Sequence, residues 1–481
     1  MWLILLLSCR SPSEDNVVPV DIGESMATVD PRFLSFAMDT AQIVGGVFWN
    51  PEGTGEAEVP RPAQDLADPK LRTLAGGLAP SVLRIGGTAA DTVYYDLSDA
   101  PADVPPEPYE TQLTREAWDG LLSFVEDTQL DLLFTLNAGP GPRDADGVWL
   151  DDQARLLVED AVAQDAPVVV WELGNEVHGF LLMHGLLLST EQYARDLNAL
   201  DALLDEVHPA SLSAGPSSAY WPVAGELVVP FSEGTLAAGG NMGVFTWHYY
   251  PTQSTRCAIT TEPASAEANL SAEVLAEVDV WAEEVEAHVD AHLPGVPIWL
   301  GESGNAQCGG EPGVSDTFAG SFWWIDQLGR IARRGHAVVI RQTLVGSDYG
   351  LLEDETLEPL PDYWVSLLWK QRMGTRVLDA SVDADDVHVY AHCDASGVGT
   401  SFAVVHLGLD EVVLDFGWPV TAYRVEADGL DAREVRLEGV PLALDAEGGL
   451  PELRGTELSE GRVAIAGQTI TFVHAERLAC P

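Results

Sequence analysis

Residues 167–176 read Pro-Val-Val-Val-Trp-Glu-Leu-Gly-Asn-Glu, an almost wholly apolar run that ends in a glycine and two polar side chains. Residues 297–302 repeat this arrangement as Pro-Ile-Trp-Leu-Gly-Glu. Short apolar runs of this kind are typical of parallel strands that are buried on both faces. The glycine permits a tight turn at the end of the strand. The two stretches therefore predict an α/β fold that presents a glutamate directly after each strand.

Similar runs recur through the first three quarters of the chain and alternate with amphipathic helical stretches, as in a parallel α/β fold. The predicted strands are residues 33–39, 81–86, 131–137, 167–173, 210–215, 244–248, 297–301 and 337–343. The predicted helices include residues 116–126, 151–164, 191–207, 272–292 and 317–334. Eight such units predict a (β/α)8 TIM barrel over residues 30–373.

The pattern changes after about Gly374 to short alternating strands separated by turns that contain Asp and Gly. The predicted strands of this part are residues 387–392, 401–406, 422–425 and 468–473. They predict a C-terminal antiparallel β-sandwich domain over residues 374–481. Residues 17–29 precede the first barrel strand, and we expect them to add a strand to this sandwich.

The net charge limits the choice of partners. The chain has 24 basic and 76 acidic residues, a formal charge of −52, and Lys70 and Lys370 are its two lysines. Binding of nucleic acid requires a basic surface, so the composition argues against it. The same surface repels long polyanions, although a single uronate inside a polar pocket is screened from most of this field. A solvated acidic surface is the simplest explanation of the excess of Asp and Glu over Lys and Arg.

Residues 1–16 predict a lipoprotein-type signal and tether. An apolar run over residues 2–7 leads into Leu6-Leu7-Ser8-Cys9, which resembles a bacterial lipobox whose cysteine is acylated after cleavage. No Lys or Arg precedes the run, so a chance apolar N-terminus is the alternative. We expect an exported protein, held at the outer membrane or cell surface of a bacterium through Cys9. No stretch approaches the ~20 apolar residues that a transmembrane helix needs, so this anchor is the expected membrane contact.

The cysteines fit export as well. If Cys9 carries lipid, four cysteines remain, enough for two disulfides in an oxidising compartment. They are Cys257, Cys308, Cys393 and Cys480. None stands in a Cys-x-x-Cys arrangement, so we expect no structural metal site. No organic cofactor is expected.

Glu176 and Glu302 are the candidate catalytic residues. The reacting groups of a (β/α)8 enzyme lie at the C-terminal ends of the strands, where both glutamates are expected. Retaining glycoside hydrolysis needs two such carboxyl groups ~5–5.5 Å apart, one as nucleophile and one as general acid/base with a raised pKa. Burial among aromatic side chains is expected to raise the pKa of the acid. Helix capping is the alternative role for either glutamate alone.

Several motifs resemble heparanase and its relatives, glycoside hydrolase family 79. Residues 171–176 look like the acid/base strand of this family, and residues 298–303 look like its nucleophile strand. The resemblance covers the chain from about residue 30 to the C-terminus. The further matching segments are residues 71–74, 83–88, 314–318, 357–364 and 374–375. The resemblance implies that Glu176 is the general acid/base and that Glu302 is the nucleophile, which forms a covalent glycosyl-enzyme intermediate.

The resemblance also implies the substrate-binding residues. Asp39, Thr88, Asn175 and Tyr349 fall where the family contacts the sugar in its −1 subsite. His248 and Tyr249 end another predicted strand and are further candidates. The backbone amides of Gln307, Cys308, Gly309 and Gly310 fall where relatives hold the carboxylate of a uronic acid, which neutral N–H donors can bind without a charge. Gln307 and Cys308 depart from the most glycine-rich form of this loop, which has Tyr and Gly there.

The cysteines can be paired with the help of this resemblance. Cys393 and Cys480 match cysteines of the family in the sandwich domain. Cys257 and Cys308 lie on loops that follow successive strands at the same rim of the barrel. We predict a Cys257–Cys308 disulfide that braces the carboxylate-binding loop; two unrelated buried thiols are the alternative.

The leading hypothesis is a retaining β-glucuronidase that acts from chain ends on oligo- or polysaccharides containing glucuronic acid. The basic residues with which heparanase grips sulfated chains have no evident counterpart, and residues 217–222 read Ser-Ser-Ala-Tyr-Trp-Pro. The alternatives are an endo-acting heparanase-like enzyme, a retaining glycosidase for a neutral sugar, and a non-catalytic surface carbohydrate-binding protein. Gly309 and Gly310 weigh against the neutral sugar, and the presence of both glutamates weighs against the non-catalytic protein.

Overall fold

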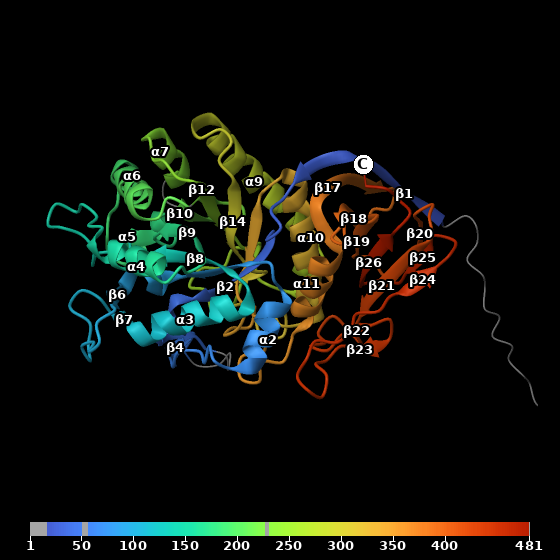
Figure 1. Ribbon diagram of the computed structural model, residues 1–481. Helices are drawn as coiled ribbons and strands as arrows, with labels where there is room; N and C mark the ends of the chain where they lie inside the picture. Colours follow the sequence, from blue (N-terminus) through green and yellow to red (C-terminus); the bar gives the residue numbers. More distant parts are fainter. Residues whose placement is uncertain (1–16, 51–55, 227–229, 481) are drawn as a thin grey trace, which may run out of the picture.

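The structure is a computed structural model that describes residues 17–50, 56–226 and 230–480 (Figure 1). Cys9 lies outside the described residues, so its acylation stays a prediction. Among the described residues, no helix combines the length and the hydrophobicity needed to cross a membrane.

Eight parallel strands close into a barrel, which confirms the predicted (β/α)8 fold. Each strand overlaps its predicted range, and the last barrel strand pairs with the first. In order around the barrel they are β2 (Leu34–Asp39), β5 (Val82–Gly86), β8 (Asp131–Leu136), β9 (Val168–Leu173), β10 (Leu212–Trp221), β12 (Val244–Tyr249), β14 (Ile298–Ser303) and β16 (Val338–Arg341). A short strand, β11 (Gly225–Glu226), pairs antiparallel with the end of β10.

Helices surround the barrel and begin at recognisable caps. Thr114 accepts a hydrogen bond from the N–H of Ala117 at the start of α3, and Ser189 caps α6 in the same way. The main helices are α2 (Pro69–Gly77), α3 (Arg115–Thr128), α4 (Asp152–Ala163), α6 (Thr190–Val207), α7 (Phe231–Ala237), α9 (Ala272–His292), α10 (Phe318–Arg334) and α11 (Pro361–Arg372).

Shorter elements form the loops at the barrel rim. The short helices are α1 (Thr40–Val44), η2 (Thr88–Thr92), η3 (Val177–Gly179), α5 (Phe180–Met183) and α8 (Ala266–Asn269). The short strands are paired as β3 (Gly46–Trp49) with β4 (Glu58–Arg61), β6 (Val93–Asp96) with β7 (Thr111–Thr114), and β13 (Thr252–Gln253) with β15 (Ala306–Gln307).

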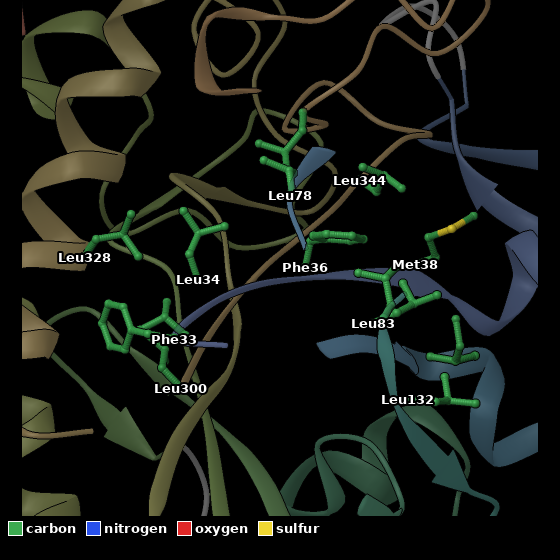
Figure 2. Packing of buried hydrophobic residues seen from close by; sticks show 14 of the residues in the cluster. Phe33, Leu34, Phe36, Met38, Leu78, Leu83, Leu132, Leu300, Leu328 and Leu344 are labelled. Carbon is green, nitrogen blue, oxygen red and sulfur yellow. The ribbon is translucent and has the colours of Figure 1, made fainter. Parts of the chain in front are cut away.

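The barrel strands alternate between two buried faces. On β2, Leu34, Phe36 and Met38 belong to the large apolar core outside the barrel, and Figure 2 shows Phe36 and Met38 near Leu83 of β5. Ala37 lies on the opposite face of β2, in a second cluster that fills the barrel interior. The other members of that interior cluster are Val82, Leu133, Val170, Ala214, Val244, Trp299, Val338 and Ile340. Such an apolar layer leaves polar side chains to the positions nearer the C-terminal ends of the strands.

The second domain is a largely antiparallel sheet of the order β23-β22-β21-β26-β19-β18-β17-β1-β20-β25, with β24 on β21. The N-terminal strand β1 lies between β17 and β20, so residues 17–28 are part of this sheet. β1 runs antiparallel to β17 and parallel to β20, and the β1–β20 pairing is the one departure from antiparallel pairing in the described part of this sheet. The strands are β1 (Val17–Thr28), β17 (Met373–Val382), β18 (Val387–Asp394), β19 (Thr400–His406), β20 (Val412–Asp415), β21 (Val420–Glu426), β22 (Arg436–Leu437), β23 (Val440–Pro441), β24 (Thr456–Leu458), β25 (Arg462–Ile465) and β26 (Thr469–Ala475).

The sheet folds over itself into two layers. Val389 and Phe402 pack in one apolar cluster with Leu414, Val463 and Ile465, which come from β20 and β25. The disulfide Cys393–Cys480 joins β18 to the end of the chain, as the resemblance implied.

The two domains meet along α10 and α11, which lie between the barrel and the sheet (Figure 1). Asp326 of α10 accepts hydrogen bonds from the hydroxyl of Tyr390 and from the ring of His388, both on β18. Tyr390 and Phe472 of the sheet belong to the same apolar core as the outer face of the barrel. The sheet domain therefore packs against the outside of the barrel and leaves the mouth to the loops that follow the strands.

Candidate active site

Glu302 lies near the C-terminal end of β14, and both of its oxygens accept short hydrogen bonds. Arg84 Nη1 donates to Oε2 at 2.7 Å, and the Tyr250 hydroxyl donates to Oε1 at 2.6 Å. Burial and the Glu302 charge raise the pKa of Tyr250 well above its usual value, so the hydroxyl keeps its proton. The two donors hold the carboxylate in one orientation at the barrel mouth.

Arg84 is fully buried and points from β5 across the interior of the barrel. Its Nε donates to Glu172 Oε2 at 2.9 Å, and its Nη2 donates to Asn175 Oδ1 at 2.9 Å. Burial acts to raise the pKa of Glu172, but the Arg84 charge and further hydrogen bonds lower it overall. One guanidinium therefore holds two carboxylates and an amide at fixed positions, as its planar fork of donors allows.

Glu176 follows β9 through a sharp turn. Gly174 and Glu176 both have positive φ, 75° and 52°. The left-handed conformation at Glu176 costs about 1 kcal/mol or more for a residue with a side chain. The Glu176 N–H donates to the carbonyl of Ser217 at 3.1 Å, which fixes this turn to β10.

His248 connects the two glutamates. Its Nδ1 lies 3.2 Å from Glu176 Oε1 and 3.9 Å from Glu302 Oε1, and its Nε2 lies 2.7 Å from the Ser217 hydroxyl. One ligand atom from each of Glu176, His248 and Glu302 lies within 4.8 Å of the other two. The two carboxyl groups therefore face one space at the barrel mouth.

The same three side chains have the spacing of a metal site. Both Glu302 oxygens, however, already accept hydrogen bonds from Arg84 and Tyr250. A metal ion would have to share Glu302 with a buried guanidinium cation. The residues therefore fit a pair of acid–base groups better than a metal centre.

The prediction that the pKa of Glu176 lies above its usual value is wrong. Burial does act to raise this pKa, but the hydrogen bond from His248 and its positive charge lower it overall. Smaller contributions come from His178 and Arg84. The ring of His248 therefore favours the ionised form of Glu176.

Asp39 ends β2 beside Glu302. Its Oδ1 accepts from the N–H of Ala41 at 2.8 Å, as the cap of α1. Burial, with the Glu302 charge as a smaller cause, raises its pKa to about 7. A Cβ at residue 87 would lie 1.7 Å from Asp39 Oδ2, so only glycine fits at Gly87. Asp39 is therefore able to donate a proton to a ligand near neutral pH.

The other residues predicted for the −1 subsite lie around the same space. Asn175 is buried against Arg84, and its N–H donates to Asp91 Oδ2 at 2.9 Å. Tyr349 is buried, and burial together with the Glu302 charge raises its pKa. Thr88 starts η2 and is exposed at the rim.

The structure places Tyr249 away from these residues. Tyr249 packs on Trp247 outside the barrel, and burial with the charge of Glu277 on α9 raises its pKa. His248 points inward, so its neighbour in the strand points outward. Tyr250, one residue later, is the tyrosine that contacts Glu302.

The sequence interpretation also missed the role of Arg84. The sequence feature that indicates this role is a single charged residue in the apolar strand Val-Leu-Arg-Ile of residues 82–85. Glu172 is likewise the one charged residue in the apolar strand of residues 168–173. Charges that are buried in this way need partners, so opposite charges on nearby strands are expected to pair.

The loop after β14 carries the predicted carboxylate-binding amides. The disulfide Cys257–Cys308 is present, with the Cα atoms 5.5 Å apart, which confirms that prediction. Arg256 Nη1 donates to the carbonyl of Gly310 at 2.9 Å. A Cβ at residue 310 would lie 2.6 Å from the backbone nitrogen of Tyr349, so Gly310 brings this loop against the site.

The amides of this loop are available to a ligand. Gly309 and Gly310 are buried, whereas Gln307 and Cys308 are partly exposed. Within the described parts of the chain, the N–H groups of Gly309 and Gly310 donate no hydrogen bond to a protein acceptor. Buried amides without acceptors are uncommon, which is consistent with a bound anion at this position.

Comparisons with known proteins agree with this geometry. The N-terminal domain of glycosyl hydrolase family 79 matches residues 63–329, more than half of the chain. The chain belongs to this family. It is 31% identical to heparanase of Gallus gallus over 96% of this chain and 95% of that protein. It is 28% identical to inactive heparanase-2 of Homo sapiens over 73% of this chain and 62% of that protein.

A solved structure with the same fold is the 4-O-α-L-rhamnosyl-β-D-glucuronidase from Fusarium oxysporum. The TM-score is 0.68 and the identity is 14%, and the match covers 95% of this chain and all of that one. This family 79 chain therefore has the fold of that glucuronidase and the sequence relationship to heparanase.

Substitution of Arg84 tests the network on which the site depends. Arg84→Met leaves Glu172 buried without its cation and frees Glu302. We expect the free energy of unfolding in urea to fall by about 3–5 kcal/mol, with loss of glycosidase activity in the protein that remains folded. In the control Arg330→Gln, which weakens a pair with Asp326 on α10, stability should fall while activity persists. Full activity of Arg84→Met would contradict the assignment.

Proposed function

We propose that the protein is a retaining, exo-acting β-glucuronidase. The observation that carries the proposal is the facing pair of Glu176 and Glu302, whose nearest oxygens lie within 4.8 Å of each other at the barrel mouth. Retaining glycosidases hold their two carboxyl groups ~5–5.5 Å apart, whereas inverting enzymes need ~6.5–9.5 Å to admit a water molecule. The short separation supports a double displacement.

Each group has a defined part in the two steps. Glu302 attacks the anomeric carbon while the proton of Glu176 passes to the departing glycosidic oxygen. A water molecule then attacks the same carbon, Glu176 takes its proton, and the bond to Glu302 breaks. Arg84 and Tyr250 orient the attacking carboxylate through one hydrogen bond to each of its oxygens. Orientation and electrostatic stabilisation of this kind are the main contributions to catalysis that a static site can make.

Specificity for a uronic acid is supported by the loop after Glu302. The free amides of Gly309 and Gly310 offer neutral donors to a sugar carboxylate, which keeps the binding site free of added cations near the nucleophile. The disulfide Cys257–Cys308 fixes this loop to the neighbouring one. The protonated form of Asp39 can donate to a sugar hydroxyl in the same pocket.

Action from the chain end is supported by the hairpin β3–β4. Trp49 of this hairpin lies against the carboxylate-binding loop, where a Cβ at residue 309 would meet its ring at 2.7 Å. Arg61 of the same hairpin pairs with Asp354. The hairpin therefore covers one side of the loop that would hold the uronate. The charge of −52 disfavours long sulfated chains for the same enzyme.

The substrate, the mechanism and the catalytic pair are tested together. We expect the enzyme to hydrolyse 4-nitrophenyl β-glucuronide. NMR should show that the β-anomer of glucuronic acid is released first. 4-Nitrophenyl β-glucoside should react far more slowly. Glu302→Gln should lower turnover by several orders of magnitude. Glu176→Ala should slow methyl β-glucuronide more than the activated aryl substrate, because only the poor leaving group needs the proton.

The control for these variants is Glu286→Gln, which should retain activity because Glu286 lies on α9 and pairs with Arg334 of α10. Faster hydrolysis of the glucoside would favour a neutral-sugar glycosidase. Efficient internal cleavage of heparan sulfate would favour endo action. Binding of glucuronides without turnover would favour a non-catalytic protein, as the similarity to inactive heparanase-2 allows.

The pH profile tests the role of His248. Glu176 acts as an acid only while it is protonated, so activity falls as the pH rises through its pKa. His248→Phe removes the hydrogen bond and charge that lower this pKa, so the alkaline fall in kcat/KM should move to higher pH. His288→Phe on α9 is the control and should leave the profile in place. An unchanged alkaline limb in His248→Phe would show that another group sets it.

A further inference from the structure

Ser217 lies at an irregular point of β10 and faces His248. The pairing of β10 with β12 shifts by one residue between Pro216 and Ser218, so Ser217 is an extra residue on β10. Ala214 belongs to the apolar cluster inside the barrel, and strict alternation from Ala214 would turn residue 217 to the outer face. The extra residue has a φ of 57° and turns the buried Ser217 side chain inward instead.

The Ser217 hydroxyl has two partners among the described residues. Arg84 Nη2 of β5 lies 3.3 Å from it and can only donate, so Ser217 Oγ accepts this bond. His248 Nε2 lies 2.7 Å away on the other side. A hydroxyl group has one hydrogen, and within the described part of the chain His248 Nε2 is the partner that can accept it. A buried hydroxyl that bonds to both partners therefore donates to Nε2, which leaves the proton of the neutral ring on Nδ1.

The place of that proton decides how His248 acts on Glu176. Nδ1 lies 3.2 Å from Glu176 Oε1. With its proton, Nδ1 donates to the carboxylate and favours the ionised form. Without the proton, the lone pair of Nδ1 would face the same oxygen, and only the protonated carboxyl group could bond to it. One hydroxyl group therefore separates two opposite effects of the ring on Glu176.

The other titratable groups that face His248 come from β9, η3 and β14. Glu302 on β14 lies 3.9 Å from Nδ1 and also favours a proton on that nitrogen. Glu172 on β9 and His178 on η3 interact with the ring through their charges. All of them remain when the Ser217 hydroxyl is removed, so a change in such a variant reports the bond to Nε2.

We propose that Ser217 is a positioning residue that holds the neutral ring of His248 with its proton on Nδ1, directed at Glu176. The proposal rests on the proposed function, in which Glu176 is the acid/base, and it adds a residue that acts on Glu176 through His248. The same contacts join the two carboxyl groups, because Arg84 donates both to Glu302 and to Ser217. One chain of hydrogen bonds therefore orients both carboxyl groups.

The alternative is that the hydroxyl only fills a polar gap at the extra residue of β10. The turn itself depends on the Ser217 carbonyl, which accepts from the Glu176 N–H at 3.1 Å and is kept in any substitution. A purely structural hydroxyl would change stability when removed, but it would change neither the tautomer of His248 nor the pH profile.

The first measurement is the tautomer of His248 in the parent protein. NMR of protein labelled with ¹⁵N in its histidines distinguishes a proton on Nδ1 from one on Nε2 at an alkaline pH where the ring is neutral. The signal of His248 is identified by its absence from His248→Phe. We expect the proton on Nδ1. A proton on Nε2, or protons on both nitrogens throughout the pH range, overturns the proposal.

The second measurement uses Ser217→Ala and Ser217→Gly. Both remove the hydroxyl and keep the carbonyl, and glycine also relieves the positive φ. We expect the ring proton to move to Nε2 and the alkaline fall in kcat/KM to move to higher pH, because Glu176 loses a donor that favours its carboxylate. At the pH optimum of the parent, kcat/KM for methyl β-glucuronide should fall about tenfold. The fall should be smaller for 4-nitrophenyl β-glucuronide, whose good leaving group needs less of the proton.

Ser218→Ala is the matched control, since this neighbouring serine of β10 is equally buried and its hydroxyl lies beside Glu226 of β11. It should keep the parent spectrum and pH profile. An unchanged alkaline limb in both Ser217 variants, or the same shift in Ser218→Ala, overturns the proposal. If the parent cleaves no glucuronide, the proposed function is overturned instead, and the NMR spectrum still decides whether Ser217 sets the tautomer.

Discussion

The buried guanidinium of Arg84 is the constraint on which the candidate site depends. Transfer of an arginine from water into a barrel interior costs several kcal/mol, and only well-placed carboxylates offset that cost. Here Glu172 and Glu302 provide them, and Asn175 accepts a third bond. The pairing therefore fixes Glu302, Glu172 and Asn175, the residue before Glu176. The geometry of the candidate site is a consequence of satisfying one buried charge.

The fold supplies the two other conditions that this network needs. The interior cluster below Arg84 is apolar, so the ion pairs are shielded from water on that side. Above it, the turn at Gly174 and the left-handed Glu176 bring the second carboxyl group back over the barrel mouth. The disulfide Cys257–Cys308 and the contact of Gly310 with Tyr349 hold the remaining wall. Rigid strands thus position the two proposed catalytic carboxyl groups, and tethered loops carry the amides that are proposed to hold the sugar.

The barrel could be predicted because parallel strands buried on both faces give unbroken apolar runs, and Glu176 and Glu302 followed from their places after such runs. Alternation along the strand places His248 and Tyr250 on one face and Tyr249 on the other. Which face points into the barrel, however, depends on how the strand is placed in the closed barrel. The direction of the Glu176 pKa was missed because it depends on a histidine from another strand. The sequence shows Arg84 as a lone charge in an apolar strand. Its partners could not be predicted, because they come together only when the barrel closes.

Covalent trapping is the measurement that tests most directly whether Glu302 and Glu176 share one anomeric carbon. The enzyme would be treated with 2-deoxy-2-fluoro-β-glucuronyl fluoride and then mapped by peptide mass spectrometry. The fluorine at C2 slows both displacements, whereas the good leaving group speeds only the first, so the glycosyl-enzyme accumulates. We expect one added fluoroglucuronyl group on the peptide that contains Glu302, with matching loss of activity. A label on Glu176 or on another residue, or turnover without any label and with inversion at the anomeric carbon, would contradict the account.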